Sequence, residues 1–415
     1  MQEISTKFTL IVPTRERPDT LRYCLKNLLS LKYPNVEILV SDNFSQDGTD
    51  LVVQEFSDSR VRYLNTGKRI SMSHNWEFAL SHVTSGWVMF IGDDDGLLPG
   101  SLEILDAVIR DTGCQALSAA SCSYIWPLHF PHSPSGELSV PLRKKSVFEV
   151  RETAEWLRKV MDGDVEYREL PWLYNGGAAS IDVINGLRNP NGAFFNSINP
   201  DIYSAVALSI GLRRYAYVHV PIAVNGASKH SGGTSLMTGG GHLKGSPTHK
   251  FLAEENIPFH RALVFGKSIH IMVYECYLQA RGLSETPRFD LARQIETAIS
   301  LSPKVFRAEI FGDCLKMARA NNVSMPSAMR VGFRRVRFAV EAIFRKIFAQ
   351  RLLTVPATDL DLDNVHAASV AAKQIDSLFA SIAKASTISR QLLGLFLFGL
   401  SLARYVSRVA LRTKR

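Results

Sequence analysis

The sequence predicts an α/β fold with an open, mainly parallel sheet, helices on both faces of the sheet, and a C-terminal helical region. Over the first hundred residues, short apolar runs alternate with segments whose apolar residues recur at helical spacing. This alternation is typical of βαβ units. From residue 251 onward, helical patterns take over. The 415 residues, 46% of them hydrophobic, can bury a large core and favour two or three domains.

The elements follow one another in a regular order. Apolar runs predict strands at 8–12, 36–40, 61–64 and 87–91. Between them, Asp19 can cap a helix whose leucines fall on one face, the turn before Thr49 opens a second helix, and 72–83 reads as a third. In open parallel sheets, ligands bind beyond the carboxyl ends of the strands. We therefore expect the functional site at that edge.

Polar residues follow three of these strands directly. Thr14, Arg15 and Glu16 come after the first, Asp42 and Asn43 after the second, and Asp93, Asp94 and Asp95 after the fourth. Three adjacent carboxylates repel one another unless a cation, hydrogen bonds or solvent compensates their charge. Oxygen ligands suit Mg²⁺ or Mn²⁺, which often also bind substrate phosphates. For an isolated triplet, an exposed acidic turn before the helix near Ser101 would be the simpler interpretation.

Three segments together resemble glycosyltransferase family 2, the inverting enzymes of the GT-A fold. They are 10–18 (LIVPTRERP), 40–49 (VSDNFSQDGT) and 90–102 (FIGDDDGLLPGSL). The resemblance implies a nucleotide-sugar donor, usually carried on UDP, and a bound Mn²⁺ or Mg²⁺. Dinucleotide-binding and P-loop glycine motifs are absent from the sequence. The order of the three segments favours a metal-bound phosphate substrate over an acidic turn.

The resemblance also assigns donor-binding residues. The segment containing Pro13, Thr14, Arg15 and Glu16 would line the nucleotide pocket, and Asp42 would accept a hydrogen bond from the base. Arg69 and Asn75 lie where the family often places groups near the donor phosphates or sugar. Asp42 could instead be a turn residue, and the last two could be ordinary surface positions.

The acidic triplet can be aligned with the family's metal motif in two registers, because Gly92 stands where the longer form of the motif begins with Asp. One register uses Asp94 and Asp95, and the other uses Asp93 and Asp95. Asp95 belongs to both and is the expected metal ligand. One of its two neighbours would bind sugar hydroxyls or a metal-bound water.

The family usually supplies the catalytic base about a hundred residues later, where this chain has Asp201 at the start of an apolar helix. A carboxylate there would take the proton of the attacking acceptor hydroxyl. Asp201 could instead be a residue favoured by the helix dipole. Asp182 and Glu169 are alternative bases.

A glycine-rich loop at 225–250 is expected to act as a lid that excludes water, with a disordered linker as the alternative. His230, within it, is a candidate metal ligand or phosphate contact. The expected domains are a transferase domain at 1–224, this loop, a helical domain at 251–355, a linker at 356–366 and C-terminal helices at 367–415.

The C-terminal region carries concentrated positive charge. Residues 330–351 contain seven Lys or Arg and a single acid, Glu341, interleaved with apolar residues, and the apolar stretch 392–403 precedes a basic tail. Basic amphipathic helices bind anionic membrane surfaces. The stretch at 392–403 is shorter than the ~20 residues needed to span a bilayer. A solvated basic face on a packed or homo-oligomerising helix is the alternative. Nucleic acid is not expected, because no binding module accompanies the charge.

Five cysteines without a Cys-x-x-Cys pair predict reduced thiols in the cytoplasm. We therefore predict a metal-dependent inverting hexosyltransferase, peripheral at the inner face of a membrane, that transfers a sugar to a glycan or lipid-linked acceptor in surface polysaccharide synthesis. A catalytically inactive scaffold of an assembly complex and a sugar-phosphate nucleotidyltransferase are the alternatives. The latter would carry a Gly-rich, Lys-containing motif near the first strand, and the sequence has none.

Overall fold

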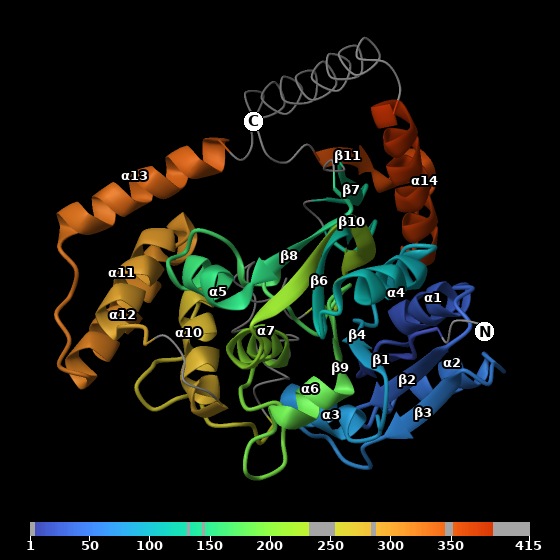
Figure 1. Cartoon of the computed structure of the whole chain (residues 1–415), viewed down its shortest axis with the longest axis horizontal. Coiled ribbons are helices and arrows are strands. Elements are labelled where there is room, and N and C mark those ends of the chain that lie inside the picture. The colour runs from blue at the N-terminus through green and yellow to red at the C-terminus, as the bar shows by residue number, and fades with distance from the viewer. Residues whose placement is uncertain are drawn as a thin grey trace.

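The first ninety residues form the predicted alternation of strands and helices (Figure 1). The computed structural model describes residues 5–130, 133–142, 146–231, 254–283, 288–344 and 352–384. Its first elements are β1 (Phe8–Thr14), α1 (Pro18–Leu29), β2 (Val36–Asp42), α2 (Thr49–Gln54), β3 (Val61–Asn65), α3 (Met72–Leu80) and β4 (Trp87–Phe90). β1 pairs in parallel with β2 and β4, and β2 pairs in parallel with β3. The predicted βαβ arrangement is confirmed.

The remainder of the sheet is mixed. Its strand order is β11-β7-β6-β9-β4-β1-β2-β3, and β10 pairs in parallel with β6 and antiparallel with β5 and β8. The elements after β4 are β5 (Gly96–Leu97), α4 (Ser101–Thr112), β6 (Ala116–Ile125), β7 (Glu137–Pro141), β8 (Phe148–Glu152), α5 (Thr153–Met161), β9 (Ala178–Ser180), α6 (Ile181–Gly186), α7 (Pro200–Gly211) and β10 (Arg214–Ala227). Antiparallel pairs predominate there, so the parallel part of the sheet is concentrated in β1 to β4.

Helices cover both faces of the sheet, as the sequence predicted. Alternate residues of β1 point to opposite faces, so Leu10 and Val12 pack in one apolar cluster with Leu21 of α1, whereas Ile11 joins the cluster on the other face with Trp76 of α3. Burial on both faces explains why these strands read as continuous apolar runs rather than alternating ones.

The chain beyond residue 254 is mainly helical. It contains α10 (Ile269–Ala280), α11 (Leu291–Leu301), α12 (Arg307–Ala320) and α13 (Ala328–Phe344). These helices lie along the left-hand side of Figure 1. α10 packs on α7, and its buried residues belong to the same apolar cluster. The helical region is thus continuous with one face of the sheet.

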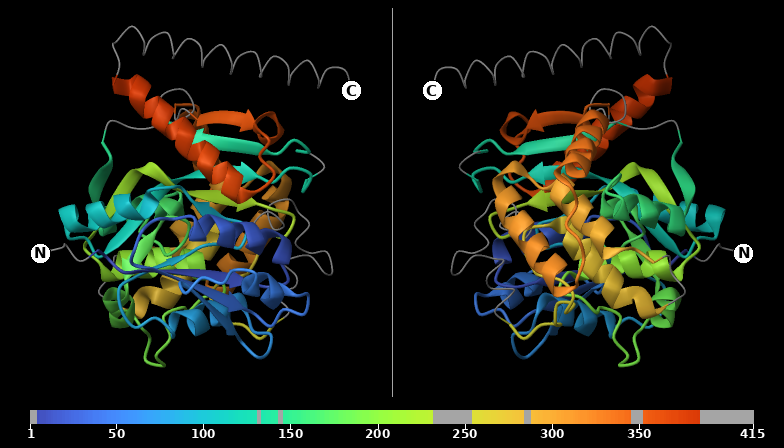
Figure 2. Two further views of the ribbon diagram at one scale, coloured as in Figure 1. Left: turned by 90° about the vertical axis from the view of Figure 1, so that its right-hand side faces the viewer. Right: turned by 90° about the vertical axis from the view of Figure 1, so that its left-hand side faces the viewer.

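The last described elements return to the sheet. β11 (Leu352–Pro356) pairs with β7, and α14 (Val365–Lys384) packs on α1 and β10. Both views of Figure 2 show α14 on the same side of the molecule as β11. Residues 356–366, expected to be a linker, include the buried residues Ala357 and Leu362, because the edge of β7 offers a strand partner just before them.

The remaining sequence expectations concern the glycine-rich loop, the C-terminal region and the cysteines. Residues 232–250 of the expected lid and the apolar stretch 392–403 lie outside the described residues. Among the helices that the structure describes, none is both long enough and apolar enough to cross a bilayer. All five cysteines are buried free thiols.

Candidate functional site

The three carboxylates of the acidic triplet lie at the carboxyl end of β4, between the loop after β1 and the end of β10. All three are buried. Each points to a different set of partners, so the triplet is not an exposed acidic turn. These partners come from segments far apart in the sequence, which explains why the sequence alone could not identify them.

Asp93 is paired with residues that follow β1. Its Oδ2 accepts a hydrogen bond of 2.8 Å from the Thr14 hydroxyl, and its Oδ1 accepts one of 2.8 Å from the Arg17 guanidinium. Burial raises the pKa of Asp93, while the positive charge of Arg17 opposes this rise. Arg17 also donates to the main-chain oxygen of His230 at 2.5 Å. Arg17 therefore connects the triplet to the beginning of the predicted loop.

Asp94 binds the segment that follows β10. Its Oδ2 accepts hydrogen bonds of 2.6 Å from the hydroxyls of Ser228 and Ser231. Its main-chain oxygen accepts one of 3.3 Å from the Trp126 indole. At Gly226 an added Cβ would lie 1.8 Å from this same oxygen, so any other residue would force β10 away from the triplet.

The side chain of Asp95 lies against Gly92, three residues before it in the sequence. Its Oδ2 accepts hydrogen bonds from the Gly92 amide at 3.0 Å and the Tyr174 hydroxyl at 2.7 Å, and its Oδ1 accepts one from the Gly226 amide at 2.6 Å. Burial, followed by the charge of Asp94, raises the pKa of Asp95 to about 7, although the bonds from Tyr174 and Gly226 oppose the rise.

This geometry explains the glycine at the start of the motif. A Cβ on Gly92 would lie 2.3 Å from Asp95 Oδ2 and 2.5 Å from the Tyr174 hydroxyl. The carboxylate of Asp95 and the phenol of Tyr174 thus fill the space that a side chain at position 92 would need.

The carboxylate oxygens of the triplet are chemically suited to bind a hard divalent cation. Their negative charge is buried and only partly compensated by the protein. Within the described part of the chain, no three Asp, Glu, His or Cys side chains converge in the arrangement that a metal ion needs. Asp95 and one neighbour would have to turn from their present partners to bind the same ion.

The residues predicted to line the nucleotide pocket lie beside the triplet, where the main-chain N–H of Asn43 donates to the main-chain oxygen of Thr14. Asp42 is buried, and it accepts hydrogen bonds from the Ser45 and Tyr63 hydroxyls, each at 2.6 Å. A base that binds Asp42 would have to share or displace one of these hydroxyls. Pro13 is the last residue but one of β1.

Arg15, one of these predicted donor-binding residues, has nitrogen atoms that make no hydrogen bond to the described residues. Its side chain is 7% exposed, and one nitrogen, Nη2, pairs with Glu254 at 2.9 Å. Its Nε and Nη1 atoms are buried and have no hydrogen-bond partner among the described residues. A buried guanidinium with unmade bonds is costly to the folded protein. It is therefore well suited to receive an anionic or carbonyl ligand.

The other predicted donor-binding residues lie in different surroundings. Glu16 and Arg69 form an ion pair at the edge of the same pocket. Asn75 is buried beneath β2, where it accepts a hydrogen bond from the Ser41 hydroxyl at 2.7 Å and donates to the Ser41 carbonyl at 3.2 Å. Asn75 supports the strand that carries Asp42.

The structure distinguishes the three candidate bases. Asp201 lies in the first turn of α7 and accepts a hydrogen bond from the Tyr167 hydroxyl at 3.2 Å. Burial raises its pKa. Glu169 is paired with Arg151 at 2.9 Å, and Asp182 is exposed in the first turn of α6.

Asp201 is linked to the triplet through a short segment. The hydroxyl of Ser204 donates to the Asp201 carbonyl and accepts from the Leu173 amide. The next residue, Tyr174, binds Asp95. This segment therefore joins the start of α7 to the triplet. Tyr174 was not identified from the sequence, because nothing in the pattern around it distinguishes it from a core aromatic.

His230 lies near the triplet, but its ring faces Asp19 at the start of α1. The distance from Nε2 to Asp19 Oδ2 is 3.1 Å, and Lys229 lies 3.3 Å from the same oxygen. The bond from His230 is the largest influence that lowers the pKa of Asp19. His230 thus fixes the end of β10 to α1 in this structure.

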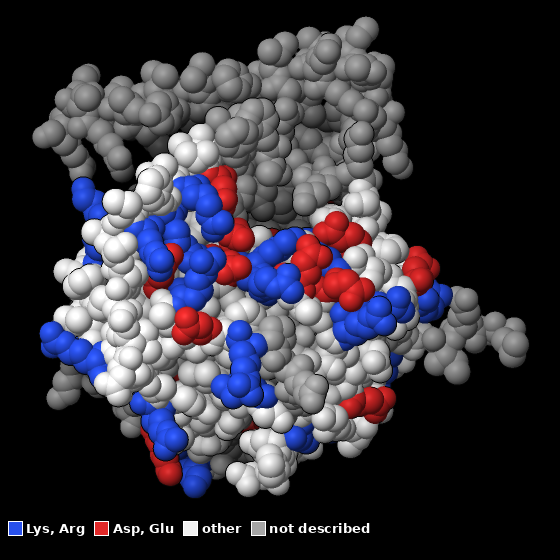
Figure 3. Space-filling view, turned by 60° about the vertical axis from the view of Figure 1, so that its left-hand side comes forward, with Lys and Arg blue, Asp and Glu red and all other residues white. Residues whose placement is uncertain are grey.

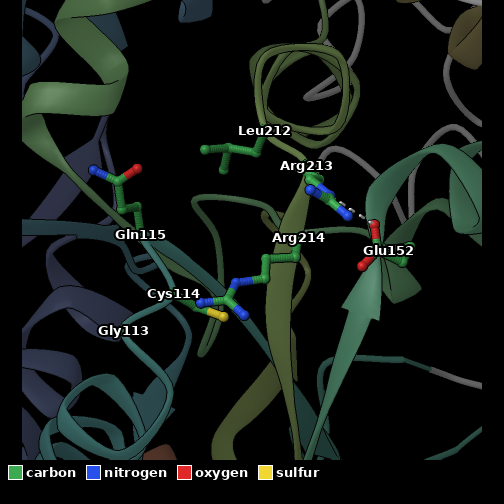
Figure 4. A pocket seen from close by; sticks show the side chains of 7 residues that line it. All are labelled: Gly113, Cys114, Gln115, Glu152, Leu212, Arg213 and Arg214. Atoms are coloured by element: carbon green, nitrogen blue, oxygen red, sulfur yellow. Dashed lines mark ion pairs between the residues drawn. The ribbon is translucent and has the colours of Figure 1, made fainter.

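A separate pocket lies at the amino ends of β6 and β10, opposite the edge that carries the triplet (Figure 4). Its volume is about 430 Å³, and its lining includes Glu152, Arg213 and Arg214. Arg213 and Glu152 face each other at 3.7 Å. None of the predicted site residues lines it.

Buried carboxylates at the carboxyl edge of the parallel part of the sheet, with a buried guanidinium beside them, are the features that the sequence predicts for a site that binds an anionic substrate. Residues 9–164 match the model of glycosyl transferase family 2. The chain therefore contains a domain of glycosyltransferase family 2, as the sequence predicted.

Two relatives match about a quarter of the chain. A GalNAc(5)-diNAcBac-PP-undecaprenol beta-1,3-glucosyltransferase of Campylobacter jejuni is 35% identical over 102 residues, which are 24% of this chain and 33% of that protein. The Escherichia coli UDP-Glc:alpha-D-GlcNAc-diphosphoundecaprenol beta-1,3-glucosyltransferase WfgD is 29% identical over 96 residues, which are 23% of this chain and 38% of that protein. The chain thus spans about a third of the length of these relatives.

Among solved structures, TarS 1–349 of S. aureus in complex with UDP-GlcNAc superposes with a TM-score of 0.46 at 14% identity, over 82% of this chain and 92% of that one. The mannosyltransferase PcManGT of Pyrobaculum calidifontis, in complex with GDP-Man and Mn²⁺, superposes with a TM-score of 0.37 at 14% identity, over 83% of this chain and 88% of that one.

Proposed function

We propose that the protein is an inverting hexosyltransferase that moves a sugar from a nucleoside diphosphate, with UDP as the expected carrier, to a lipid-linked glycan. The observation that carries this proposal is the placement of three buried carboxylates at the carboxyl end of β4 inside a family 2 domain. The two relatives named for undecaprenol-diphosphate-linked substrates support a lipid-linked acceptor.

The donor would bind at the ends of β1 and β2. The unpartnered Nε and Nη1 atoms of Arg15 would donate to the diphosphate or to a carbonyl of the base. Asp42 would accept the N–H of uracil by sharing the positions now taken by Tyr63 or Ser45. Asp42 is the last residue of β2, and Arg15 directly follows β1, so the paired strands β1 and β2 position both groups.

Asp95, with Asp93 or Asp94, would hold Mn²⁺ or Mg²⁺, and the ion supplies positive charge for the departing diphosphate. Asp201 would accept the proton of the attacking acceptor hydroxyl. Burial raises the pKa of its carboxyl, which makes it a stronger base than an ordinary aspartate once ionised. The Tyr167 hydroxyl would hold this carboxylate in place.

The proposal is tested by measuring nucleoside diphosphate release from a panel of UDP-, GDP- and dTDP-sugars, each with Mn²⁺, Mg²⁺ or chelator. We expect one sugar nucleotide to raise the melting temperature and to be turned over only with the metal. Failure of every nucleotide sugar to bind or react would refute the proposal. Turnover that persists in chelator would refute the metal requirement alone.

A further inference from the structure

Helix α13 has two apolar faces, and only one of them packs on the part of the chain that the structure describes. On the inner face, Phe338 is buried against α11. Arg334 on the same face lies 3.3 Å from Glu296 and donates to the Asp162 carbonyl at 2.7 Å. Arg335 also donates to the Ile299 carbonyl at 2.8 Å, and Arg337 is ion-paired with Asp164. Three basic residues of this helix therefore serve its attachment to the protein.

The opposite face carries an apolar stripe along the whole helix. Its residues are separated by four, three, four and three positions, which places them on one side of an α-helix. Each is between 47% and 72% exposed, and together they form what we call the outer stripe: Met329, Phe333, Val336, Val340 and Ile343. Of the described elements, α11 is the principal neighbour of α13. A continuous exposed apolar stripe of this kind marks an interaction surface.

Arginines lie beside the outer stripe. By helical spacing, Arg330 and Arg337 lie along one border of the stripe. Arg337 is ion-paired with Asp164 and lies 3.6 Å from Glu341, the acid on the same border. Figure 3, which brings the left-hand side of Figure 1 forward, shows Lys and Arg side chains gathered over the upper half of this face, with acidic side chains among them. The sequence continues with Arg345, Lys346 and Arg351.

We propose that the outer stripe of α13 inserts into the interface of an anionic bilayer, with Arg330 and Arg337 at the level of the headgroups. The stripe supplies the apolar contact, and the arginines supply the attraction to anionic lipid. A second copy of the chain fits less well in an antiparallel two-fold pair, because that pairing would bring the arginine borders of the two helices together.

This surface would hold the protein where a lipid-linked acceptor lies, and that consequence rests on the proposed function. Binding to lipid itself does not depend on it. The relevant measurement is therefore membrane binding, with donor turnover in the absence of lipid as a separate readout.

The experiment is flotation of the full chain with vesicles of phosphatidylcholine alone or mixed in equal parts with phosphatidylglycerol. We expect flotation with the anionic vesicles and much less with the neutral ones. In the double variant Phe333→Ser/Val336→Ser, the partition coefficient should fall at least roughly tenfold. Leu51→Ser is the matched control, because Leu51 is an exposed apolar residue on α2, at the other side of the molecule, and should float like the parent.

Two results would overturn this proposal. One is equal flotation of the parent and the double variant. The other is a parent that does not float but sediments as a dimer, with the double variant monomeric, because the stripe would then bind a second copy. Donor turnover without lipid should be equal in parent and double variant. If the parent floats but turns over no donor, the proposed function fails while the membrane surface stands.

Discussion

The acidic triplet at the centre of the candidate site differs from the two flanks, which are the donor side at Arg15 and the acceptor side at Asp201. The difference is how many hydrogen bonds the protein itself makes to the polar groups. At the centre, each carboxylate of the triplet accepts at least two hydrogen bonds from the protein. On the donor flank, Arg15 retains two buried nitrogens without partners. On the acceptor flank, a single side-chain bond, from Tyr167, is found at the carboxylate of Asp201.

This difference separates groups that shape the site from groups that are left for substrates. A buried polar atom without a partner costs stability, so its retention is more easily explained by a ligand than by folding. The carboxylates of the triplet are already held by hydrogen bonds from the protein, and Asp95 and one neighbour would have to leave some of these partners to bind one ion. Substitutions on the flanks should therefore impair substrate binding or proton transfer. Substitutions in the triplet should impair stabilisation of the charge on the departing diphosphate.

The largest expected effect is on the acceptor flank. Asp201→Asn removes the proposed base, so kcat should fall about 10²- to 10⁴-fold, while the Kd for the donor changes little. In the parent, kcat should decrease on acidification as Asp201 becomes protonated. Because the pKa of Asp201 is raised, this decrease should begin at a higher pH than an ordinary carboxylate would give.

The matched controls for this variant are Asp182→Asn and Glu169→Gln, which alter the two other candidate bases. Both should keep kcat within a few fold of the parent. A large loss in either control, with turnover preserved in Asp201→Asn, would move the base to that residue.

A smaller effect is expected at the centre. Asp95→Asn keeps the size of the side chain but removes its charge, so turnover should fall about 10²- to 10³-fold. Asp50→Asn, an exposed substitution on α2, is the control. Unimpaired Mn²⁺ binding and turnover in Asp95→Asn would remove the triplet from the proposed chemistry.

Asp95 also predicts a pH dependence of stability in the presence of chelator. Its pKa is about 7 in the folded protein and about 4 in an unfolded chain, so the folded state holds this proton more tightly. The free energy of unfolding should therefore decrease as the pH rises from about 4 to about 7, and this contribution should be absent from Asp95→Asn. Denaturant titrations of both proteins across this range measure the difference.

On the donor flank, Arg15→Gln should raise the Kd for UDP roughly 10- to 100-fold, the loss expected for one or two charge-assisted hydrogen bonds. Stability should change little, because two of the nitrogens removed have no partner among the described residues. Arg22→Gln, which breaks only an exposed ion pair with Glu55, is the control. Unchanged affinity in Arg15→Gln would show that its unpartnered atoms do not meet the donor.

The sequence was sufficient for the local features and insufficient for the contacts between distant segments. The four apolar runs and the polar residues after them locate the site edge, because parallel strands end at one side of a sheet. The partners of the triplet could not be predicted, since Tyr174 and Ser228 are brought to it by β4, β9 and β10 pairing across more than seventy residues. The role of Gly92 could not be predicted either, because it depends on the position of the Asp95 side chain, which fills the space beside the glycine.

The smallest expected effect concerns Tyr167, which acts through Asp201 rather than on the substrate. Its hydroxyl donates to the ionised carboxylate and lowers the pKa of Asp201 against the larger effect of burial. Tyr167→Phe should therefore move the acid limb of the kcat profile to higher pH by up to about one unit, and kcat above that limb should fall less than about tenfold. Tyr33→Phe is the control, because its hydroxyl donates to the Thr6 carbonyl, outside the site. A fall in kcat with no shift of the limb would mean that Tyr167 only packs beside Trp172, and the acceptor flank would then depend on Asp201 alone.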